Sequence, residues 1–337
     1  MKLLFTALAL ALALFIAGVP ATAEAAPGKM TGGQKYDMPA WFKMSFLDLK
    51  DDLKDANANQ RQIMLFLHLE ECPYCARMLN ENFRKGATRE FIERHFDVIG
   101  IDIRGSRTVA WFDGHQYSEL ALTRKLKVYA TPTIIFIDPE GKTALRLDGF
   151  RKRQAFRQAL DYVQQKAYRQ ESLASFIAKQ QKTSYRLRAE PMFRELTDFR
   201  NYRKPLAVMF EDKDCTDCDE FHDKVLTHPE VLPELSKFQV VRLDAYSDRP
   251  ITDINGKRTT PKQWVEQLGL TYRPGIVLFN EGKEIARVDG MLYHFHFKEV
   301  LRYVSGGYYK KFGSFSQYNA ARRPELLQQG VDINFAQ

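Results

Sequence analysis

The feature that most constrains the fold is an internal repeat in which each copy carries one Cys-x-x-Cys pair. The four cysteines of the chain form two local pairs, Cys72 with Cys75 and Cys215 with Cys218. A disulfide between residues three apart closes almost no loop, so it restricts the unfolded chain little. The pairs therefore suit thiol–disulfide exchange or metal binding better than they suit stapling of the fold.

The two copies share their spacing as well as their cysteines. From the first cysteine of the pair to a proline before an apolar strand, the distance is 60 residues for Pro132 and 59 for Pro274. From the same cysteine to the end of an earlier strand, the distance is 30 residues for Asp102 and 29 for Asp244. This agreement predicts two copies of one supersecondary unit.

Within each copy the apolar pattern predicts the same order of elements: strand, Cys-x-x-Cys at the start of a helix, strand, helix, and a hairpin of two strands before a last helix. In the first copy the expected strands are 62–69, 96–103, 129–137 and 145–147. In the second copy they are 206–211, 238–244, 272–279 and 284–288. The sequence therefore predicts an α/β protein.

The first residues have the pattern of an export signal. Lys2 precedes an apolar run over residues 3–19, and small residues of the A-x-A type follow Pro20. This pattern predicts a cleaved signal peptide at residues 1–26, with an uncleaved N-terminal anchor as the alternative. The net charge of +8 is dispersed along the chain, so no nucleic-acid partner is expected.

Taken together, these motifs resemble the thioredoxin superfamily in tandem. The Asp113-Gly114 loop, the run Leu-Lys-Val-Tyr-Ala-Thr-Pro-Thr at 126–133 and the export signal look most like the periplasmic SoxW-like thiol–disulfide proteins. The resemblance implies two thioredoxin-like folds, each a mixed central sheet flanked by helices, at 45–165 and 195–305. A helical connector at 166–194 and a C-terminal tail at 306–337 complete the expected organisation, and the expected location is the periplasm.

The first pair has the residues that disulfide exchange needs. Cys72 is expected at a helix N-terminus, where the helix dipole and free amides lower the pKa of a thiol. Pro73 suits the first helical position, and Cys75, one turn on, can attack a mixed disulfide. Cys72 is therefore predicted to be the more exposed, attacking thiol. Tyr74 offers a flat aromatic ring for substrate contact.

The resemblance adds a second element to this site. It implies that Pro132 is cis and faces the thiols, which leaves the backbone of Thr131 to pair with a bound peptide. The redox-active disulfides are then the only cofactors expected, and no metal is assigned. Expected partners are protein thiols and disulfides, together with a membrane thiol–disulfide electron donor.

The direction of electron flow depends on the charges near Cys72. Glu70 and Glu71 precede it and are expected to raise the pKa of its thiol, which favours a reductase. Cys-Pro-Tyr-Cys itself resembles the glutaredoxin dipeptide and does not decide the direction. Resemblance to reductases and isomerases with a threonine before the cis proline favours electron donation to substrate disulfides.

The second pair is open to three interpretations. Acidic residues surround it and are expected to raise the pKa of both thiols: Asp212, Asp214, Asp217 and Asp219. Arg273 stands where the first copy has threonine, can offset part of this charge, and is assigned with Pro274 to substrate contact. Cys215 and Cys218 form either a second redox centre that exchanges electrons with the first, a stable disulfide in a binding domain, or a metal site with His222.

Two classes of function follow. The first is a thiol–disulfide oxidoreductase acting through Cys72 and Cys75, with Cys215 and Cys218 as further catalytic candidates. The alternative is a non-catalytic tandem thioredoxin-fold binding or chaperone module, or a metal-handling protein. The sequence assigns Phe46 to the core of an N-terminal segment, and interprets His294 and His296 as the surface of the last helix.

Overall fold

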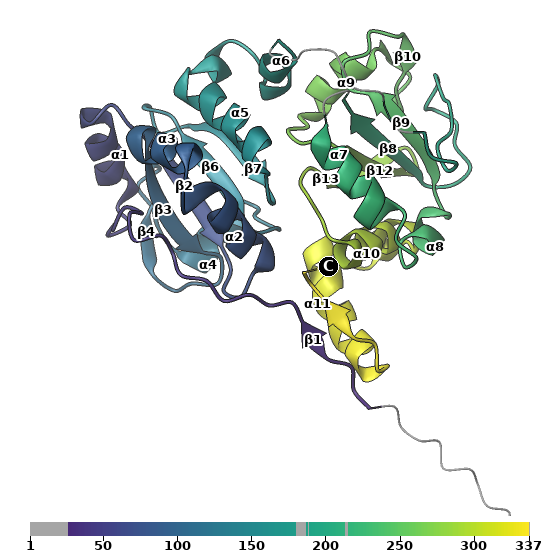
Figure 1. Ribbon diagram of the computed structural model, residues 1–337, viewed down its shortest axis with the longest axis horizontal. Coiled ribbons are helices and arrows are strands. Elements are labelled where there is room, and N and C mark those ends of the chain that lie inside the picture. Colours follow the sequence, from purple (N-terminus) through teal and green to yellow (C-terminus); the bar gives the residue numbers. More distant parts are fainter. Residues whose placement is uncertain (1–25, 180–186, 188, 213–214, 337) are drawn as a thin grey trace, which may run out of the picture.

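The computed structural model describes residues 26–179, 187, 189–212 and 215–336. These residues form two units of the same design, joined on one side by a connecting segment (Figure 1). The expected signal peptide lies outside the described residues, apart from Ala26. Within the described part of the chain, every helix is too short or too polar to cross a membrane.

The first unit is built on a four-stranded sheet in the order β3-β2-β6-β7. Its strands are β2 (Gln62–His68), β3 (Phe96–Asp102), β6 (Thr133–Ile137) and β7 (Thr143–Asp148). β2 pairs with β3 in parallel and with β6 antiparallel, and β6 pairs antiparallel with β7. The helices that flank this sheet are α1 (Leu49–Ala58), α2 (Pro73–Met78), α3 (Ala87–His95), α4 (Glu119–Lys125) and α5 (Arg153–Gln164).

The central strand β2 shows why the sheet is covered on both faces. Successive side chains of a strand point to opposite faces, and all but the last residue of β2 are buried. Met64 and Phe66 pack in one apolar cluster with residues of α2, α3 and α5. Ile63, Leu65 and Leu67 pack in another with residues of α1 and α4. The continuous apolar run in the sequence is therefore the signature of a strand between two helical layers.

The second unit repeats this topology, with the order β13-β12-β8-β9. Its strands are β8 (Leu206–Glu211), β9 (Gln239–Asp244), β12 (Gly275–Asn280) and β13 (Lys283–Val288). Its helices are α7 (Thr216–Phe221), α8 (Leu232–Leu235), α9 (Pro261–Leu268) and α10 (His294–Ser305). The predicted fold class, two mixed sheets flanked by helices, is confirmed.

The helix after each cysteine pair is shorter than the sequence indicates. α2 ends at Met78 and α7 at Phe221, and each continues as a π-helical turn, Leu79–Phe83 and His222–Leu226. Each unit also has a small hairpin, β4 (Thr108–Ala110) with β5 (Gln116–Ser118) and β10 (Ile251–Thr252) with β11 (Arg258–Thr259). The first hairpin encloses the Asp113-Gly114 loop.

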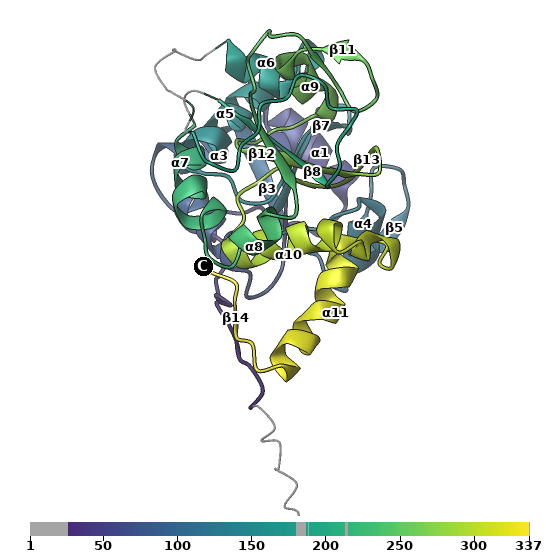
Figure 2. The ribbon, with the colours of Figure 1, turned by 90° about the vertical axis from the view of Figure 1, so that its right-hand side faces the viewer.

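The segments outside the two units join the ends of the chain. The connector carries α6 (Leu173–Ala178), and the tail forms α11 (Phe315–Gln328), whose Tyr318 is buried against α10. β1 (Met30–Thr31) pairs in parallel with β14 (Ile333–Asn334), so the two ends of the described chain run side by side (Figure 2). From β1 the N-terminal arm, residues 32–46, continues to the first unit, where the Gln34 amide donates to the Glu71 carbonyl.

Candidate active site

The first cysteine pair lies where β2 leads into α2. Cys72 is the N-cap of α2, Pro73 occupies the first turn, and Cys75 is one turn along the helix. Both cysteines are free thiols. Cys72 is 6% exposed and Cys75 is fully buried. Of the two sulfurs, the one at the start of the helix is therefore nearer to solvent.

Two donors converge on the sulfur of Cys72. The amide of Cys75 donates to Sγ at 3.2 Å, and the hydroxyl of Thr131 donates to it at 3.3 Å. The Thr131–Pro132 bond is cis, and the Thr131 carbonyl lies 3.6 Å from the same sulfur. The structure thus brings Thr131 to Cys72 and Cys75, although 59 positions separate Thr131 from Cys72 in the sequence.

The hydrogen bonds decide the charge state of the pair. Burial by itself raises the pKa of Cys72, but hydrogen bonds from Cys75, Thr131 and the backbone outweigh it, so the pKa lies below its ordinary value. Burial raises the pKa of Cys75 well above its ordinary value, and hydrogen bonding to Cys72 and the charge on Cys72 raise it further. The sulfur of Cys72 therefore favours the thiolate form that attacks a disulfide, whereas the sulfur of Cys75 keeps its proton.

The expectation that Glu70 and Glu71 raise the pKa of Cys72 is wrong. Both residues are exposed, and Glu71 lies 3.9 Å from Lys35 of the N-terminal arm. Water and this lysine screen their charge, whereas the donors at the sulfur act at hydrogen-bond distance. The lowered pKa of Cys72 follows from the close donors.

A partly buried tyrosine of the N-terminal arm lies behind the pair. The hydroxyl of Tyr36 donates to the Leu69 carbonyl at 2.6 Å and lies 3.1 Å from His68 Nδ1. Burial raises the pKa of Tyr36, and the nearby sulfurs of Cys75 and Cys72 raise it further. Tyr36 thus stays neutral beside the thiols. Sequence reasoning missed this residue because no motif links the arm to the pair.

The second pair forms a disulfide. Cys215 is the N-cap of α7, and its sulfur is bonded to that of Cys218. Cys215 is 6% exposed and Cys218 is 2% exposed. The Arg273–Pro274 bond is cis, as in the first unit.

The charges around this disulfide are partly neutralised. Lys152 of the first unit lies 2.9 Å from one oxygen of Asp217, and the hydroxyl of Tyr272 donates to the other at 2.6 Å. Arg273 donates to the Tyr272 carbonyl at 2.9 Å, and its guanidinium lies over the ring of Tyr246. Asp212 and Asp219 also have interaction partners, and Asp214 lies outside the described residues.

The third interpretation of the second pair, a metal site with His222, disagrees with the disulfide and with the contacts of this histidine. His222 is 1% exposed, with Nδ1 2.9 Å from a Glu190 oxygen and Nε2 2.6 Å from a Glu211 oxygen. Both ring nitrogens of His222 are therefore occupied by contacts with glutamates. Burial lowers the pKa of His222, but the bond to Glu211 and the charges of both glutamates outweigh it, and the pKa is raised.

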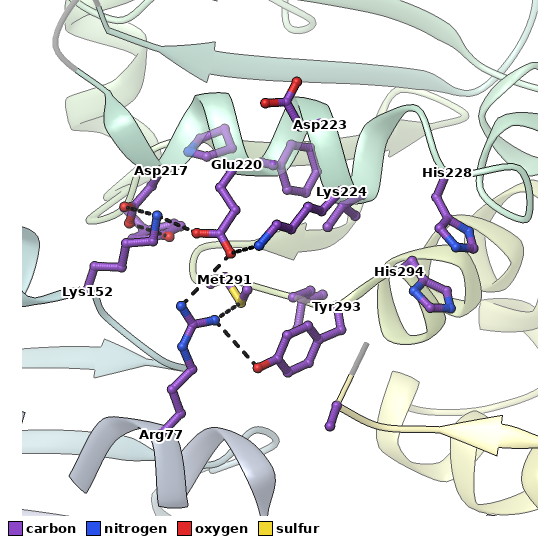
Figure 3. Close-up of a pocket in the computed structure, with 16 residues that line it drawn as sticks. Arg77, Lys152, Asp217, Glu220, Asp223, Lys224, His228, Met291, Tyr293 and His294 are labelled. Atoms are coloured by element: carbon purple, nitrogen blue, oxygen red, sulfur yellow. Dashed lines mark hydrogen bonds and ion pairs between the residues drawn. The ribbon is translucent and has the colours of Figure 1, made fainter. Parts of the chain in front are cut away.

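The two units face each other through equivalent parts of the repeat. Tyr74, the third residue of the first motif, packs on Tyr293, the N-cap of α10, with ring centroids 4.9 Å apart. Asp217, the third residue of the second motif, pairs with Lys152, the N-cap of α5 (Figure 3). Such reciprocal contacts define an interface with an internal two-fold relation, as in an isologous dimer.

This interface covers the first motif. Tyr74 is 7% exposed, its hydroxyl accepts from the Tyr293 amide at 3.0 Å, and it lies 3.0 Å from His296 Nδ1. Burial, together with the charge of Arg323, lowers the pKa of His296 to about 4. His296 is therefore neutral at pH 7 and shares a hydrogen bond with the tyrosine hydroxyl. It does not lie on the free surface of the last helix, as the sequence suggested.

A cavity of about 600 Å³ lies beside this interface. Arg77 and Lys152 of the first unit and Asp217, Pro274 and Tyr293 of the second are among the residues that line it (Figure 3). Ion pairs cross it, including Lys152 to Glu220 at 2.7 Å. The cavity therefore opens next to the second motif and its cis proline.

Comparison with known proteins agrees with this architecture. Residues 49–164 and 192–305 match the model of the family described as Thioredoxin-like domain. No curated protein matches the chain significantly.

Solved structures similar to the chain include three from bacteria, each about the size of one unit. A thioredoxin-fold protein from Helicobacter pylori is 22% identical, with a TM-score of 0.33 over 36% of this chain and 84% of its own. A thioredoxin from Thermus thermophilus is 27% identical, with a TM-score of 0.28 over 34% and 83%. The oxidised C-terminal domain of DsbD from Neisseria meningitidis is 18% identical, with a TM-score of 0.26 over 35% and 92%. On the two matched segments, the chain belongs to the Thioredoxin-like domain family.

Proposed function

We propose that the chain is a thiol–disulfide oxidoreductase that exchanges disulfides with protein substrates through Cys72 and Cys75. The observation that carries the proposal is the convergence of the Cys75 amide and the Thr131 hydroxyl on Cys72 Sγ. These donors stabilise a thiolate at one sulfur while the neighbouring sulfur stays protonated.

The reaction consists of two exchanges. The Cys72 thiolate attacks one sulfur of a substrate disulfide, forms a mixed disulfide and releases the other substrate sulfur as a thiolate. Cys75 then loses its proton to water or to the released thiolate and attacks Cys72 Sγ, which frees the second substrate sulfur. Two electrons pass to the substrate, and Cys72 and Cys75 end as a disulfide.

We propose that the reaction runs in the reducing direction, because the sequence resembles reductases with a threonine before the cis proline. The lowered pKa of Cys72 works against this direction, because a stabilised thiolate favours the reduced pair. Turnover then needs an electron donor, for which we propose a membrane thiol–disulfide protein. Equilibration with glutathione tests the direction: a reductase has a potential below about −220 mV.

Insulin reduction with dithiothreitol as donor tests the activity. Cys72→Ser should abolish the acceleration over dithiothreitol alone, because no attacking thiolate remains. Cys75→Ala should form a stable mixed disulfide with substrate, which appears as a covalent complex on a non-reducing gel. Wild-type protein that does not accelerate the reaction would instead support the non-catalytic binding or chaperone module, a function that the burial of Tyr74 favours.

We further propose that the chain is exported to the periplasm and cleaved near residue 26. Lys2, the apolar run 3–19 and the A-x-A residues after Pro20 support this. N-terminal sequencing of protein from a periplasmic fraction tests it, because an uncleaved anchor would leave Met1 in the membrane fraction.

A further inference from the structure

Two histidines of the second unit, His228 and His294, line the end of the cavity farthest from Lys152, and a glutamate lies beside them (Figure 3). His228 follows the π-helical turn after α7, Glu230 lies two residues on, and His294 is the first residue of α10. One ligand atom from each of the three lies within 4.8 Å of the others. We propose that they form a binding site for a divalent first-row transition ion such as Zn²⁺.

The chemistry of the donor set agrees with such an ion. Imidazole nitrogens and a carboxylate oxygen are ligands that zinc, copper and nickel accept, whereas calcium and magnesium prefer oxygen alone. Ligand atoms on a tetrahedral zinc ion lie about 3.3 Å apart, given Zn–N distances of about 2.0–2.1 Å. The three ligand atoms, within 4.8 Å of one another, are therefore close to the spacing that such an ion requires.

The two histidine rings lie face to face, with centroids 3.8 Å apart and an angle of 9° between their planes. Among the described residues the ring of His294 makes no hydrogen bond, so an imidazole nitrogen remains available to a metal.

Two groups contact the proposed ligands and would compete with a metal ion: the ammonium of Lys298 and the backbone amide of Glu230. Lys298 Nζ lies 2.5 Å from one carboxylate oxygen of Glu230, and the second oxygen is left for an ion. The Glu230 amide donates to His228 Nδ1 at 3.3 Å, which is long for such a bond and is weak competition. The site thus offers three ligands, and water completes the coordination.

An ion here would connect the turn after α7 to the start of α10. The same end of α10 carries Tyr293 and His296, which cover Tyr74 of the first motif. The inference rests on residues that the proposed redox chemistry does not use, so either can fail without the other.

Zinc binding is measured directly. Untagged protein with both cysteine pairs oxidised, so that no thiol binds metal, is dialysed against Zn²⁺ and assayed by mass spectrometry. We expect one zinc per chain, with affinity lower by about tenfold or more in each of His228→Gln, His294→Gln and Glu230→Gln. His115→Gln, an exposed histidine of the first unit, is the matched control and should bind as wild type does. Wild-type protein that retains no zinc above the buffer blank overturns the proposal.

A spectroscopic measurement keeps the test independent of small losses of stability. Pulsed electron paramagnetic resonance of the Cu²⁺-loaded wild-type protein should show two bound imidazoles, and that of His294→Gln should show one. Two imidazoles that persist in His294→Gln would place the ion elsewhere and overturn the assignment.

Discussion

Arg77 and Glu220 occupy the same position in the two repeats, five residues after the first cysteine, and they face each other across the interface. Arg77 Nη2 lies 4.0 Å from Glu220 Oε1. Phe150 and Met291, another equivalent pair, form a β-bridge between the units. The duplicated fold thus packs on itself about an internal two-fold axis, and opposite charges at one repeat position make the contact favourable (Figure 3).

Reversing one of these charges should separate the units. Glu220→Arg places a cation opposite Arg77 and Lys152, which replaces two attractions with repulsions. We expect a larger radius in small-angle X-ray scattering and several-fold faster alkylation of Cys72, because Tyr74 is uncovered. Glu220→Gln should have a smaller effect, and adding Arg77→Glu to Glu220→Arg should restore part of the compact state. An unchanged radius in Glu220→Arg would contradict a role for this pair.

Thr131 should control the reactivity of Cys72. Thr131→Val removes the hydroxyl that donates to Sγ, and a hydrogen bond to a charged group contributes about 1.5–3 kcal/mol. The pKa of Cys72 should rise by about one unit or more, so that iodoacetamide reacts about tenfold more slowly near neutral pH. Thr131→Ser keeps the donor and serves as the control. Equal alkylation rates for the valine and serine variants across the pH range would show that the backbone amides lower the pKa of Cys72 without the hydroxyl.

The second disulfide should be dispensable for general reductase activity. Cys215→Ser/Cys218→Ser leaves Cys72 and its donors in place, and we expect it to keep at least part of the insulin-reducing activity. Cys72→Ser in the same assay should keep none. If both variants lose activity equally while circular dichroism shows intact folding, the two pairs pass electrons in series.

His222 should make the stability of the second unit depend on pH. Its pKa is raised because hydrogen bonds and charges of Glu211 and Glu190 outweigh burial. Folding therefore gains stability at pH values below the ordinary 6.5, and this gain is lost as the pH rises through the higher folded value. Urea unfolding should show a falling free energy above about pH 6.5 in the wild type. His222→Gln should flatten this slope, and a slope as steep as that of the wild type would assign the titration to another group.

Much of the fold was predictable because the pattern that encodes it is local and occurs twice. The apolar run of β2 and the cysteine pair at the start of α2 follow from periodicity and spacing along the chain, and the cis proline was implied by the resemblance to the thioredoxin superfamily. Residues far apart, such as Cys72 and Thr131, meet because the order of strands brings their ends together.

The remaining features depend on how surfaces meet. The effect of Glu70 and Glu71 on Cys72 is decided by solvent, and the contact of His296 with Tyr74 by the packing of one unit on the other. Neither effect produces a pattern of residue spacing that can be recognised in the sequence. Phe46, assigned to the core from its type alone, is fully exposed, because it precedes Leu47, whose positive φ of 64° turns the chain before α1. The opposite charges of Arg77 and Glu220 at equivalent positions of the repeat are a signal that could have indicated this interface.

The parallel pair of β1 and β14 orders events during folding. Residues 30–31 are made first and residues 333–334 some 300 positions later, so β1 has no partner until nearly all of this sequence has been synthesised. Both units have their strands complete by residue 288 and can fold before that moment. The arm that brings Tyr36 to the thiols therefore gains its strand partner, at the end far from Tyr36, only after the first unit has been synthesised.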